Sequence, residues 1–290
     1  MVSVMAKSGN GDLSRSSLNS LARRAASKSG RLLLSWADGN GSAPGDPVVH
    51  RGFPMPPRSL RNHMCGEIFL SDDFYFQSCV VEATRLTAQL GYRPGSKVLD
   101  VGCGLGRLAT GMIAQFGERA NYLGLEPNRD FYEWCSSTIE PAHPSYQFVH
   151  VDIASELYNP DGTIDGATLS LPVPDSSIDI VYCWGVFTNA IEEHVSRYIS
   201  EFQRVVATDG RIFLTAFVEE QDAVVDFNPD EYVPFDCVVP LNVVRYSMNW
   251  MFELFDRHGL RVEDFRYHGG MFPMQSEITL SPSDPPGRLS

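Results

Sequence analysis

The sequence predicts an α/β fold, a doubly wound and mostly parallel sheet of seven strands with helices on both faces. Short apolar runs of strand length alternate with segments of helical periodicity, which is the pattern of a parallel sheet. A glycine-rich turn joins the first apolar run directly to a helical segment. Three successive runs end at an acidic residue, so their side chains are expected at one edge of the sheet.

The individual elements follow from local composition and spacing. Apolar and β-branched runs predict strands over residues 97–101, 122–125, 146–151, 178–183, 211–217, 261–267 and 275–280. The segment Ser71-Asp72-Asp73 is typical of a helix N-terminus. Apolar residues three and four positions apart predict helices over residues 71–90, 105–116, 129–139, 194–206 and 246–257. Asp209 and Gly210 predict the turn into the fifth strand.

Composition divides the 290 residues into one domain with extensions. Residues 1–50 are rich in Ser, Gly, Ala and Arg, and we expect a flexible basic tail. Residues 51–280 are assigned to one catalytic domain, in which 51–92 form an N-terminal helix and lid. Residues 218–245 lie in an acidic stretch that is too long for a simple connection, which predicts a lid over the substrate. Residues 281–290 are a Pro- and Ser-rich tail.

Charge separates the N-terminal tail from the body. Residues 1–36 hold six basic residues and one acid, whereas the remaining residues hold 17 basic and 35 acidic residues. An acidic body repels phosphate backbones, so we expect no nucleic-acid partner. The basic, Ser-rich start is also typical of an organelle transit peptide, which is the alternative to a simple tail.

Apolar runs and cysteines argue against two further classes. No apolar run approaches the roughly 20 residues of a membrane span, so we expect none. The six cysteines form no CxxC pair and no metal-ligand spacing. We therefore expect no metal site, and reduced thiols in a cytoplasmic protein.

The segment Asp100–Gly106 predicts a ligand site. Its glycines stand at every second position, where they allow positive φ and a close approach of the backbone to a ligand at a strand end. A dinucleotide site needs G-x-G-x-x-G, and Arg107 stands where the last glycine would be, so a nicotinamide oxidoreductase is the weakest alternative. A carboxylate at Asp100 suits the ammonium group of S-adenosylmethionine, directly or through water.

Two further acids lie at the same expected sheet edge. Glu126 ends the second strand, twenty residues after Gly106, where a carboxylate can accept hydrogen bonds from both hydroxyls of a ribose. Asp152 follows the third strand. Taken singly, each acid is equally well a turn or helix-cap residue. Their position after successive strands favours one ligand site.

The segment Asp100–Gly106 resembles motif I of the class I S-adenosylmethionine-dependent methyltransferases, and the likeness extends over about residues 72–280. Leu171–Asp179 is similar to the family's approach to its fourth strand. Arg204–Arg211 is similar to its RVLKPGG turn, with Asp209 replacing the first glycine. The resemblance implies a Rossmann-like sheet, S-adenosyl-L-methionine as cofactor and S-adenosyl-L-homocysteine as product.

The resemblance also implies which residues bind the cofactor. In the family, the residue at Asp152 contacts the adenine amino group and the next residue, Ile153, packs on the ring. The expected set is Asp100, Gly102, Cys103, Gly104, Gly106, Glu126, Pro127, Asp152, Ile153 and Cys183.

We predict a small-molecule acceptor that is methylated on a hydroxyl group, in secondary-metabolite or glycan biosynthesis. Residues 183–187, at the end of the fourth strand, carry neither the Asn/Asp-Pro-Pro-aromatic motif nor the Pro-Cys motif of nucleic-acid methyltransferases. Trp184, Tyr246 and Trp250 are expected to line the acceptor pocket, although aromatic residues at helical spacing are often simply core.

A hydroxyl acceptor needs a base, and His194 is the first choice because it opens the helix after the fourth strand. His63 and His268 are the competing candidates, and each histidine is equally well a surface or packing residue. Two other functions stay open: an N-methyltransferase whose acidic lid attracts a small amine, and a non-catalytic subunit that binds the cofactor. A homo-oligomer also stays open.

Overall fold

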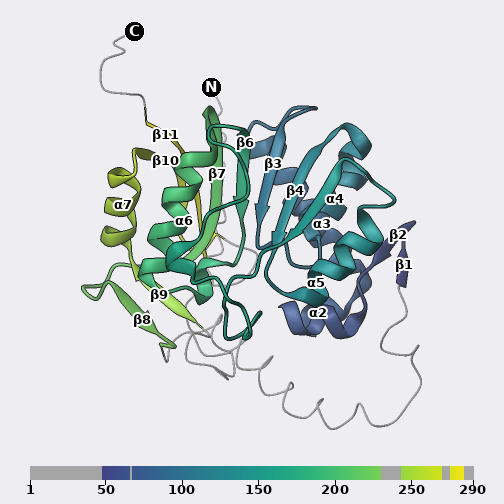
Figure 1. Ribbon diagram of the computed structural model, residues 1–290, viewed down its shortest axis with the longest axis horizontal. Helices are drawn as coiled ribbons and strands as arrows, with labels where there is room; N and C mark the ends of the chain where they lie inside the picture. The colour runs from purple at the N-terminus through teal and green to yellow at the C-terminus, as the bar shows by residue number, and fades with distance from the viewer. Residues whose placement is uncertain (1–47, 66, 230–242, 270–274, 284–290) are drawn as a thin grey trace, which may run out of the picture. The chain divides into compact units, whose positions relative to one another are not determined.

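The computed structural model describes residues 48–65, 67–229, 243–269 and 275–283, all within one compact unit. Their main feature is a sheet in which seven strands follow one another in the spatial order β10-β11-β7-β6-β3-β4-β5 (Figure 1). The strands are β3 (Lys97–Val101), β4 (Asn121–Glu126), β5 (Tyr146–His150), β6 (Ile178–Cys183), β7 (Val206–Glu219), β10 (Leu260–Arg266) and β11 (Ser276–Pro282).

The five strands from β7 to β5 are parallel, whereas β11 runs antiparallel to β7 and β10 antiparallel to β11. The chain passes from β3 outward to β4 and β5, then returns to β6 on the other side of β3 and continues to β7. This reversal opens a crevice at the carboxyl ends of β3 and β6, which is where sheets of this type bind ligands. The predicted doubly wound, mostly parallel sheet is confirmed.

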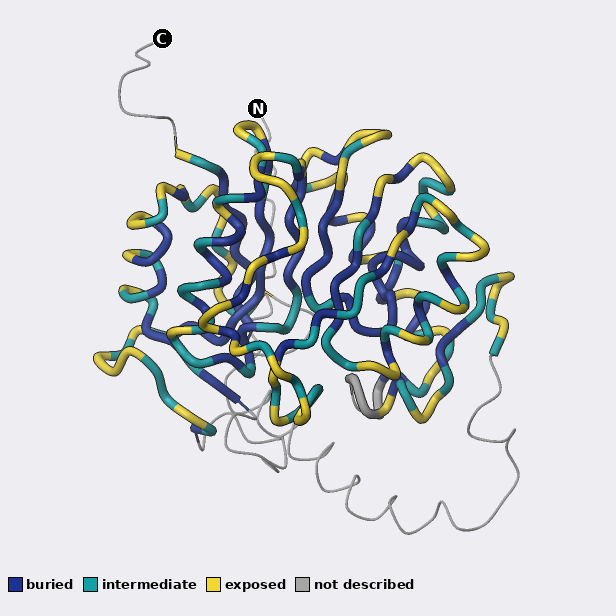
Figure 2. The backbone as a smooth tube through the Cα atoms, in the orientation of Figure 1, coloured by how far each residue is buried: buried dark blue, intermediate teal, exposed yellow. Residues whose placement is uncertain are grey.

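Helices cover both faces of the sheet, as its alternating side chains require. Leu99, Val181 and Leu214 point to the face covered by α6 (Glu192–Val205) and α7 (Met248–Arg257). The intervening side chains, among them Val98, Ile180 and Phe213, point to the opposite face. That face is covered by α3 (Asp72–Gln89), α4 (Arg107–Phe116) and the π-helical turn Cys135–Ile139, which continues α5 (Arg129–Trp134). Figure 2 shows the strands buried between these layers.

Smaller elements precede and extend this sheet. A two-stranded ribbon, β1 (Val48–His50) and β2 (Phe53–Met55), and the helix α2 (Arg58–Cys65) precede α3. The strand β9 (Val244–Ser247) pairs with the end of β7, and β8 (Val225–Phe227) pairs with β9. No helix among the described residues is long and apolar enough to cross a membrane.

The structure corrects four predicted boundaries. The helix expected from residue 246 begins at Met248, because Tyr246 belongs to β9 and Ser247 stands in extended conformation as the N-cap. The fifth strand begins at Val206 rather than at residue 211, and its pairing with β6 jumps from Val206 to Arg211 through an irregularity. Residues 48–50 form β1 and Ser281 and Pro282 end β11, so they do not belong to the tails.

Candidate functional site

The glycine-rich loop after β3 has the backbone geometry that the sequence predicts. Gly102, Gly104 and Gly106 all have positive φ, at 74°, 56° and 71°. The backbone N–H groups of Gly102 and Cys103 both donate to the carbonyl oxygen of Leu125, which ties the loop to the end of β4. A Cβ atom on Gly102 would lie 2.4 Å from Cγ2 of Val186. Glycine is therefore required there both for φ and for space.

Glu126 closes this loop from the tip of β4. Its Oε2 accepts a hydrogen bond of 2.7 Å from the N–H of Gly104, and its Oε1 accepts one of 2.8 Å from the N–H of Asn128. The side chain is almost completely buried, and burial raises the pKa of Glu126 to about 7 against the two hydrogen bonds, which lower it. Each oxygen keeps a second lone pair with which it can accept a further hydrogen bond.

Asp100, in the fourth position of β3, is the second buried acid at this edge. The hydroxyl of Tyr122 donates to its Oδ2 at 2.6 Å. Burial raises the pKa of Asp100 to about 7, and nearby Glu82 contributes to the rise, whereas Tyr122 and Arg107 lower it. A cationic ligand group would favour the ionised form of this carboxylate.

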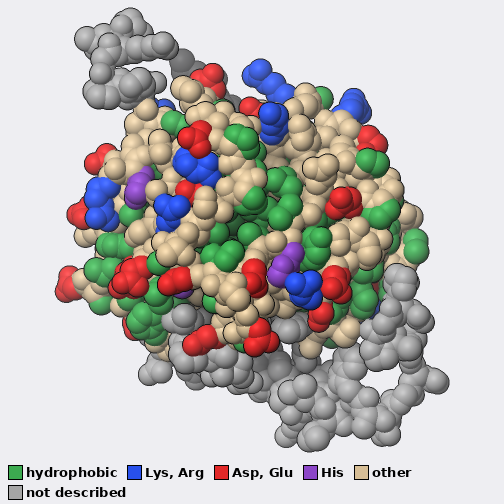
Figure 3. Space-filling model, in the orientation of Figure 1, with side chains coloured by type: hydrophobic (Ala, Val, Ile, Leu, Met, Phe, Trp, Pro, Cys, Tyr) green, Lys and Arg blue, Asp and Glu red, His purple; other side chains and the backbone are tan. Residues whose placement is uncertain are grey.

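These acids line a cavity of about 550 Å³ at the crevice of the sheet. Its wall is formed by the tips of β3, β4 and β6, by the start of α6 and by residues 153–160 of the crossover between β5 and β6. Figure 3 shows one face of the protein, on which hydrophobic side chains gather around a central hollow. The predicted residues that line the cavity are Asp100, Gly102, Cys103, Gly104, Glu126, Pro127, Ile153, Trp184 and His194.

A charged cluster that the sequence did not point to forms another part of the wall. The guanidinium of Arg107 stacks on the ring of Trp184 at 4.0 Å and lies 3.6 Å from Oε1 of Glu82, a buried residue of α3. The other oxygen of Glu82 accepts hydrogen bonds from Arg85 and Tyr182. In the sequence, Arg107 marks only the failure of a dinucleotide motif, and no local signal joins it to Glu82.

His194 lies in the first turn of α6, and its Nε2 is 3.3 Å from Oδ1 of Asp165 in the crossover. Asn189 also lines the cavity. His268 does not line the cavity; it contacts Glu219 at 2.9 Å instead. The side chain of His63 and residues 230–242 of the predicted lid lie outside the described part of the structure.

Five predicted residues do not line the cavity, and their contacts explain why. Asp152 holds its own loop: its Oδ1 accepts from Asn159, and its Oδ2 accepts from the N–H and hydroxyl of Thr163. Gly106 is the N-cap of α4, and its Cα lies beside the side chains of Cys135 and Ile139. Cys183 is fully buried in the core beneath the crevice.

Tyr246 and Trp250 are the remaining two of the five predicted residues that do not line the cavity. Tyr246 is fully buried on β9, and its hydroxyl donates to the carbonyl oxygens of Phe187 and Ala190. Trp250 stacks on its ring at 5.7 Å and packs against the core. Tyr246 therefore lies in the core and Trp250 packs against it, and neither side chain lines the cavity.

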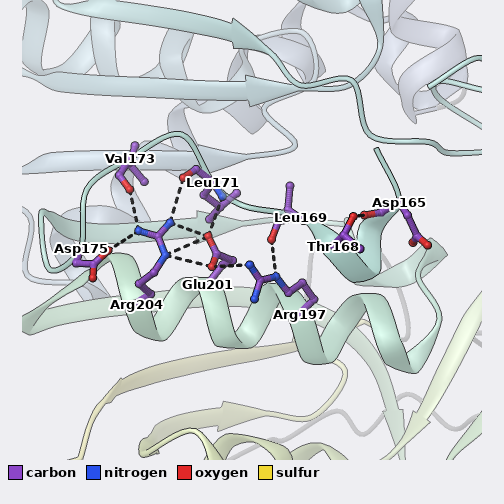
Figure 4. A network of polar contacts seen from close by, with 9 residues as sticks. All are labelled: Asp165, Thr168, Leu169, Leu171, Val173, Asp175, Arg197, Glu201 and Arg204. Atoms are coloured by element: carbon purple, nitrogen blue, oxygen red, sulfur yellow. Dashed lines mark hydrogen bonds and ion pairs between the residues drawn. The ribbon is translucent and has the colours of Figure 1, made fainter. Parts of the chain in front are cut away.

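The crossover that forms the cavity wall is held by one face of α6 (Figure 4). Arg204 donates to the carbonyl oxygens of Leu171 and Val173, and Glu201 accepts from the N–H of Leu171 at 2.8 Å. Arg197, one helical turn before Glu201, donates to the carbonyl oxygen of Leu169. The crossover is therefore attached to α6 through backbone groups of three alternate residues, Leu169, Leu171 and Val173.

Comparison with known proteins agrees with this architecture. Residues 99–214 match the family model described as a methyltransferase domain. The magnesium protoporphyrin IX methyltransferase of Synechocystis PCC 6803, solved with bound S-adenosylmethionine, is 18% identical. The match covers 78% of this chain and 90% of that one, with a TM-score of 0.50.

A second similar structure comes from the complex between the Haloferax volcanii Trm112 methyltransferase activator and a putative methyltransferase. It is 14% identical, with 77% of this chain and 96% of that chain covered and a TM-score of 0.53. At these identities the likeness to both structures concerns the fold.

Proposed function

Because this chain carries a class I, S-adenosylmethionine-dependent methyltransferase domain, we propose that it methylates a small-molecule acceptor on a hydroxyl oxygen. The observation that carries the proposal is the pair of buried carboxylates, Asp100 and Glu126, which flank one glycine loop and line one cavity. A hydroxyl acceptor is favoured by His194, an imidazole on the wall of the same cavity.

The residues present fit S-adenosylmethionine. Two acids whose pKa values are raised to about 7 by burial gain from a ligand that brings positive charge, and this cofactor carries a sulfonium and an ammonium. Asp100 would hold the ammonium. Glu126, already fixed by Gly104 and Asn128, would accept hydrogen bonds from the ribose hydroxyls. Ile153 would pack on the adenine ring.

The bound cofactor supplies a methyl group on a positively charged sulfur. A nucleophile attacks the methyl carbon in line with the carbon–sulfur bond, and the sulfur is the leaving group. The protein's part is to orient the two reactants and to accept the proton that the hydroxyl loses, and positioning supplies much of the acceleration. His194 is the proposed proton acceptor, and Trp184 is the proposed contact for the acceptor.

N-methylation of a small amine is the second candidate, because acids dominate the cavity wall. Among the described residues that line it are Glu82, Asp100, Glu126 and Glu156, against one guanidinium, that of Arg107. Such a wall attracts a cationic amine as well as the cationic cofactor. Biosynthesis of secondary metabolites or glycans, a cytoplasmic location and a homo-oligomer remain predictions from the sequence.

Calorimetry and an acceptor panel test the proposal. We expect S-adenosylhomocysteine to bind the full chain and NAD to give no heat; binding of NAD alone would contradict the assigned cofactor. Matched pairs of phenols and anilines, and of sugar alcohols and amino sugars, are then incubated with S-adenosylmethionine, and methylated product is detected by mass spectrometry. Faster turnover of the hydroxyl member at all salt concentrations supports O-methylation. Faster turnover of the amine, weakened by salt, overturns it.

A His194→Gln variant tests the base. We expect it to lose turnover of the hydroxyl acceptor while its affinity for S-adenosylhomocysteine stays within about twofold of the wild type, because the base acts on the acceptor. Binding without turnover of any acceptor in the panel by the wild-type chain would instead favour the non-catalytic alternative.

A further inference from the structure

A carboxylate and an imidazole meet at the rim of the cavity. Nε2 of His194 lies 3.3 Å from Oδ1 of Asp165, although the two residues belong to different elements. The histidine is about three-quarters buried and lines the cavity, whereas Asp165 is two-thirds exposed and does not line it. A carboxylate that contacts the ring from outside the cavity lining can orient it as a base.

The carboxylate of Asp165 is held by the backbone that follows it. Asp165 is the N-cap of the 3-10 turn Gly166–Thr168, and its Oδ1 accepts a hydrogen bond of 2.9 Å from the N–H of Ala167. Its carbonyl oxygen accepts from the N–H and the hydroxyl of Thr168. The side chain is therefore fixed by its own turn, independently of the histidine.

Gly166 forms the surface on which the imidazole packs. A Cβ atom on Gly166 would lie 2.8 Å from both Cγ and Nδ1 of His194 and 3.1 Å from Cδ2. The glycine has negative φ, so its backbone does not require glycine. What requires a small residue is the ring, which lies against the Cα atom of Gly166.

The crossover carrying Asp165 and Gly166 is attached along α6 by a row of side chains. His194, Arg197, Glu201 and Arg204 are three, four and three residues apart, which places them on one helix face. The last three bind backbone groups of Leu169, Leu171 and Val173. His194 is the member of this row at the cavity, and it meets a carboxylate rather than a backbone group.

We propose that Asp165 is a positioning residue that fixes the orientation and tautomer of His194. Its carboxylate accepts the Nε2–H of the neutral ring, so Nδ1 carries the lone pair. In the reaction, Nδ1 takes the proton of the acceptor hydroxyl while the oxygen forms its bond to the methyl carbon. The carbon–sulfur bond breaks, its electron pair stays on sulfur, and the imidazolium then forms beside Asp165. This inference rests on His194 as the base under the proposed function.

Nitrogen NMR of the full chain, labelled with ¹⁵N-histidine and saturated with S-adenosylhomocysteine, tests the tautomer without any acceptor. The His194 signals are assigned by their loss in His194→Gln. We expect the neutral ring to be Nε2-protonated in the wild type. In Asp165→Ser, whose shorter side chain can still cap the 3-10 turn but does not reach Nε2, we expect both tautomers, because no carboxylate then accepts the Nε2–H.

Asp175→Asn is the matched control. Asp175 is an acid of the same crossover that pairs with α6 through Arg204 at 2.7 Å but does not line the cavity, so its variant should keep the wild-type tautomer. An Nδ1-protonated ring in the wild type, or unchanged signals in Asp165→Ser, would overturn the inference.

Turnover of the best acceptor in the panel separates this inference from the proposed function. Ser at residue 165 can still cap the 3-10 turn, so we expect Asp165→Ser to lower kcat by about tenfold or more while KM for S-adenosylmethionine stays within about twofold. If His194→Gln is inactive but Asp165→Ser matches the wild type, only the positioning role fails. If His194→Gln is fully active, the assignment of the base itself fails.

Discussion

Oε2 of Glu126 accepts a 2.7 Å hydrogen bond from the backbone N–H of Gly104, so the tip of β4 holds the loop that follows β3. The other oxygen of this carboxylate accepts from Asn128, where α5 begins. One buried side chain thus joins the loop, the strand and the helix that surround the cavity.

Replacing Glu126 with Gln should weaken binding of S-adenosylhomocysteine by about tenfold or more. The N–H groups of Gly104 and Asn128 each donate to a separate oxygen of Glu126, whereas the Gln amide has only one acceptor oxygen. Isothermal titration calorimetry measures this. The control is Glu133→Gln, an exposed acid on α5, which should bind as the wild type does. Equal affinities of the two variants would contradict the role of Glu126.

Binding of S-adenosylhomocysteine should strengthen as the pH rises through about 7. Burial raises the pKa of Asp100 to about 7, so below that pH the acid is protonated and cannot pair with the ligand's ammonium. Titrations between about pH 6 and pH 8 measure the effect, and Asp100→Asn should weaken binding and flatten much of the dependence. An affinity that is independent of pH in the wild type would contradict this account.

The same raised pKa values predict how the ligand-free fold responds to pH. The folded pKa values of Asp100 and Glu126, about 7, exceed their ordinary values of 3.8 and 4.5, so the folded state holds protons that the unfolded state releases. These two groups therefore favour folding below about pH 4, and that contribution is lost as the pH rises toward 7. Urea unfolding of the ligand-free chain at about pH 5.5 and about pH 8 measures this loss, and Asp100→Asn should make the difference between the two pH values smaller.

Gly102→Ala should destabilise the protein by more than the strain of its backbone alone. A left-handed conformation costs a non-glycine residue about 1–2 kcal/mol, and the clash with Val186 at 2.4 Å adds an overpacking cost of about 1–3 kcal/mol. Gly91, which follows the C-cap of α3, has a similar φ of 69° but open space, so Gly91→Ala isolates the first cost. Urea unfolding compares the two, and the double variant Gly102→Ala/Val186→Ala should recover part of the difference.

Arg204→Leu should loosen the crossover from α6. The guanidinium donates to two backbone carbonyl oxygens and pairs with Glu201, which is buried, so we expect a loss of about 2–4 kcal/mol in the free energy of unfolding. Arg261→Leu is the control, because its pair with Glu263 is exposed and should contribute less than about 1 kcal/mol. Similar losses in both variants would contradict the role of Arg204 in attaching the crossover to α6.

The strands and helices were predictable where the local pattern and the tertiary contacts agree. Residues 97–101 and 178–183 were predicted as strands and are β3 and β6 with the same boundaries. The prediction was wrong at Tyr246, because pairing with β7 extends the chain through Ser247, although the residues from 246 onward have helical spacing. Partner strands are not visible in local periodicity.

The sequence alone determined that a glycine loop follows the first parallel strand and that acids stand at or just after the ends of successive strands, because both follow from residue order and from the parallel direction of the strands. Only the tertiary structure decided what each side chain faces. It turns Asp152 toward Thr163 and Asn159, brings Glu82 of α3 to Arg107, and sets Asp165 beside His194. These contacts join residues from separate elements, and their geometry depends on packing that no local pattern encodes.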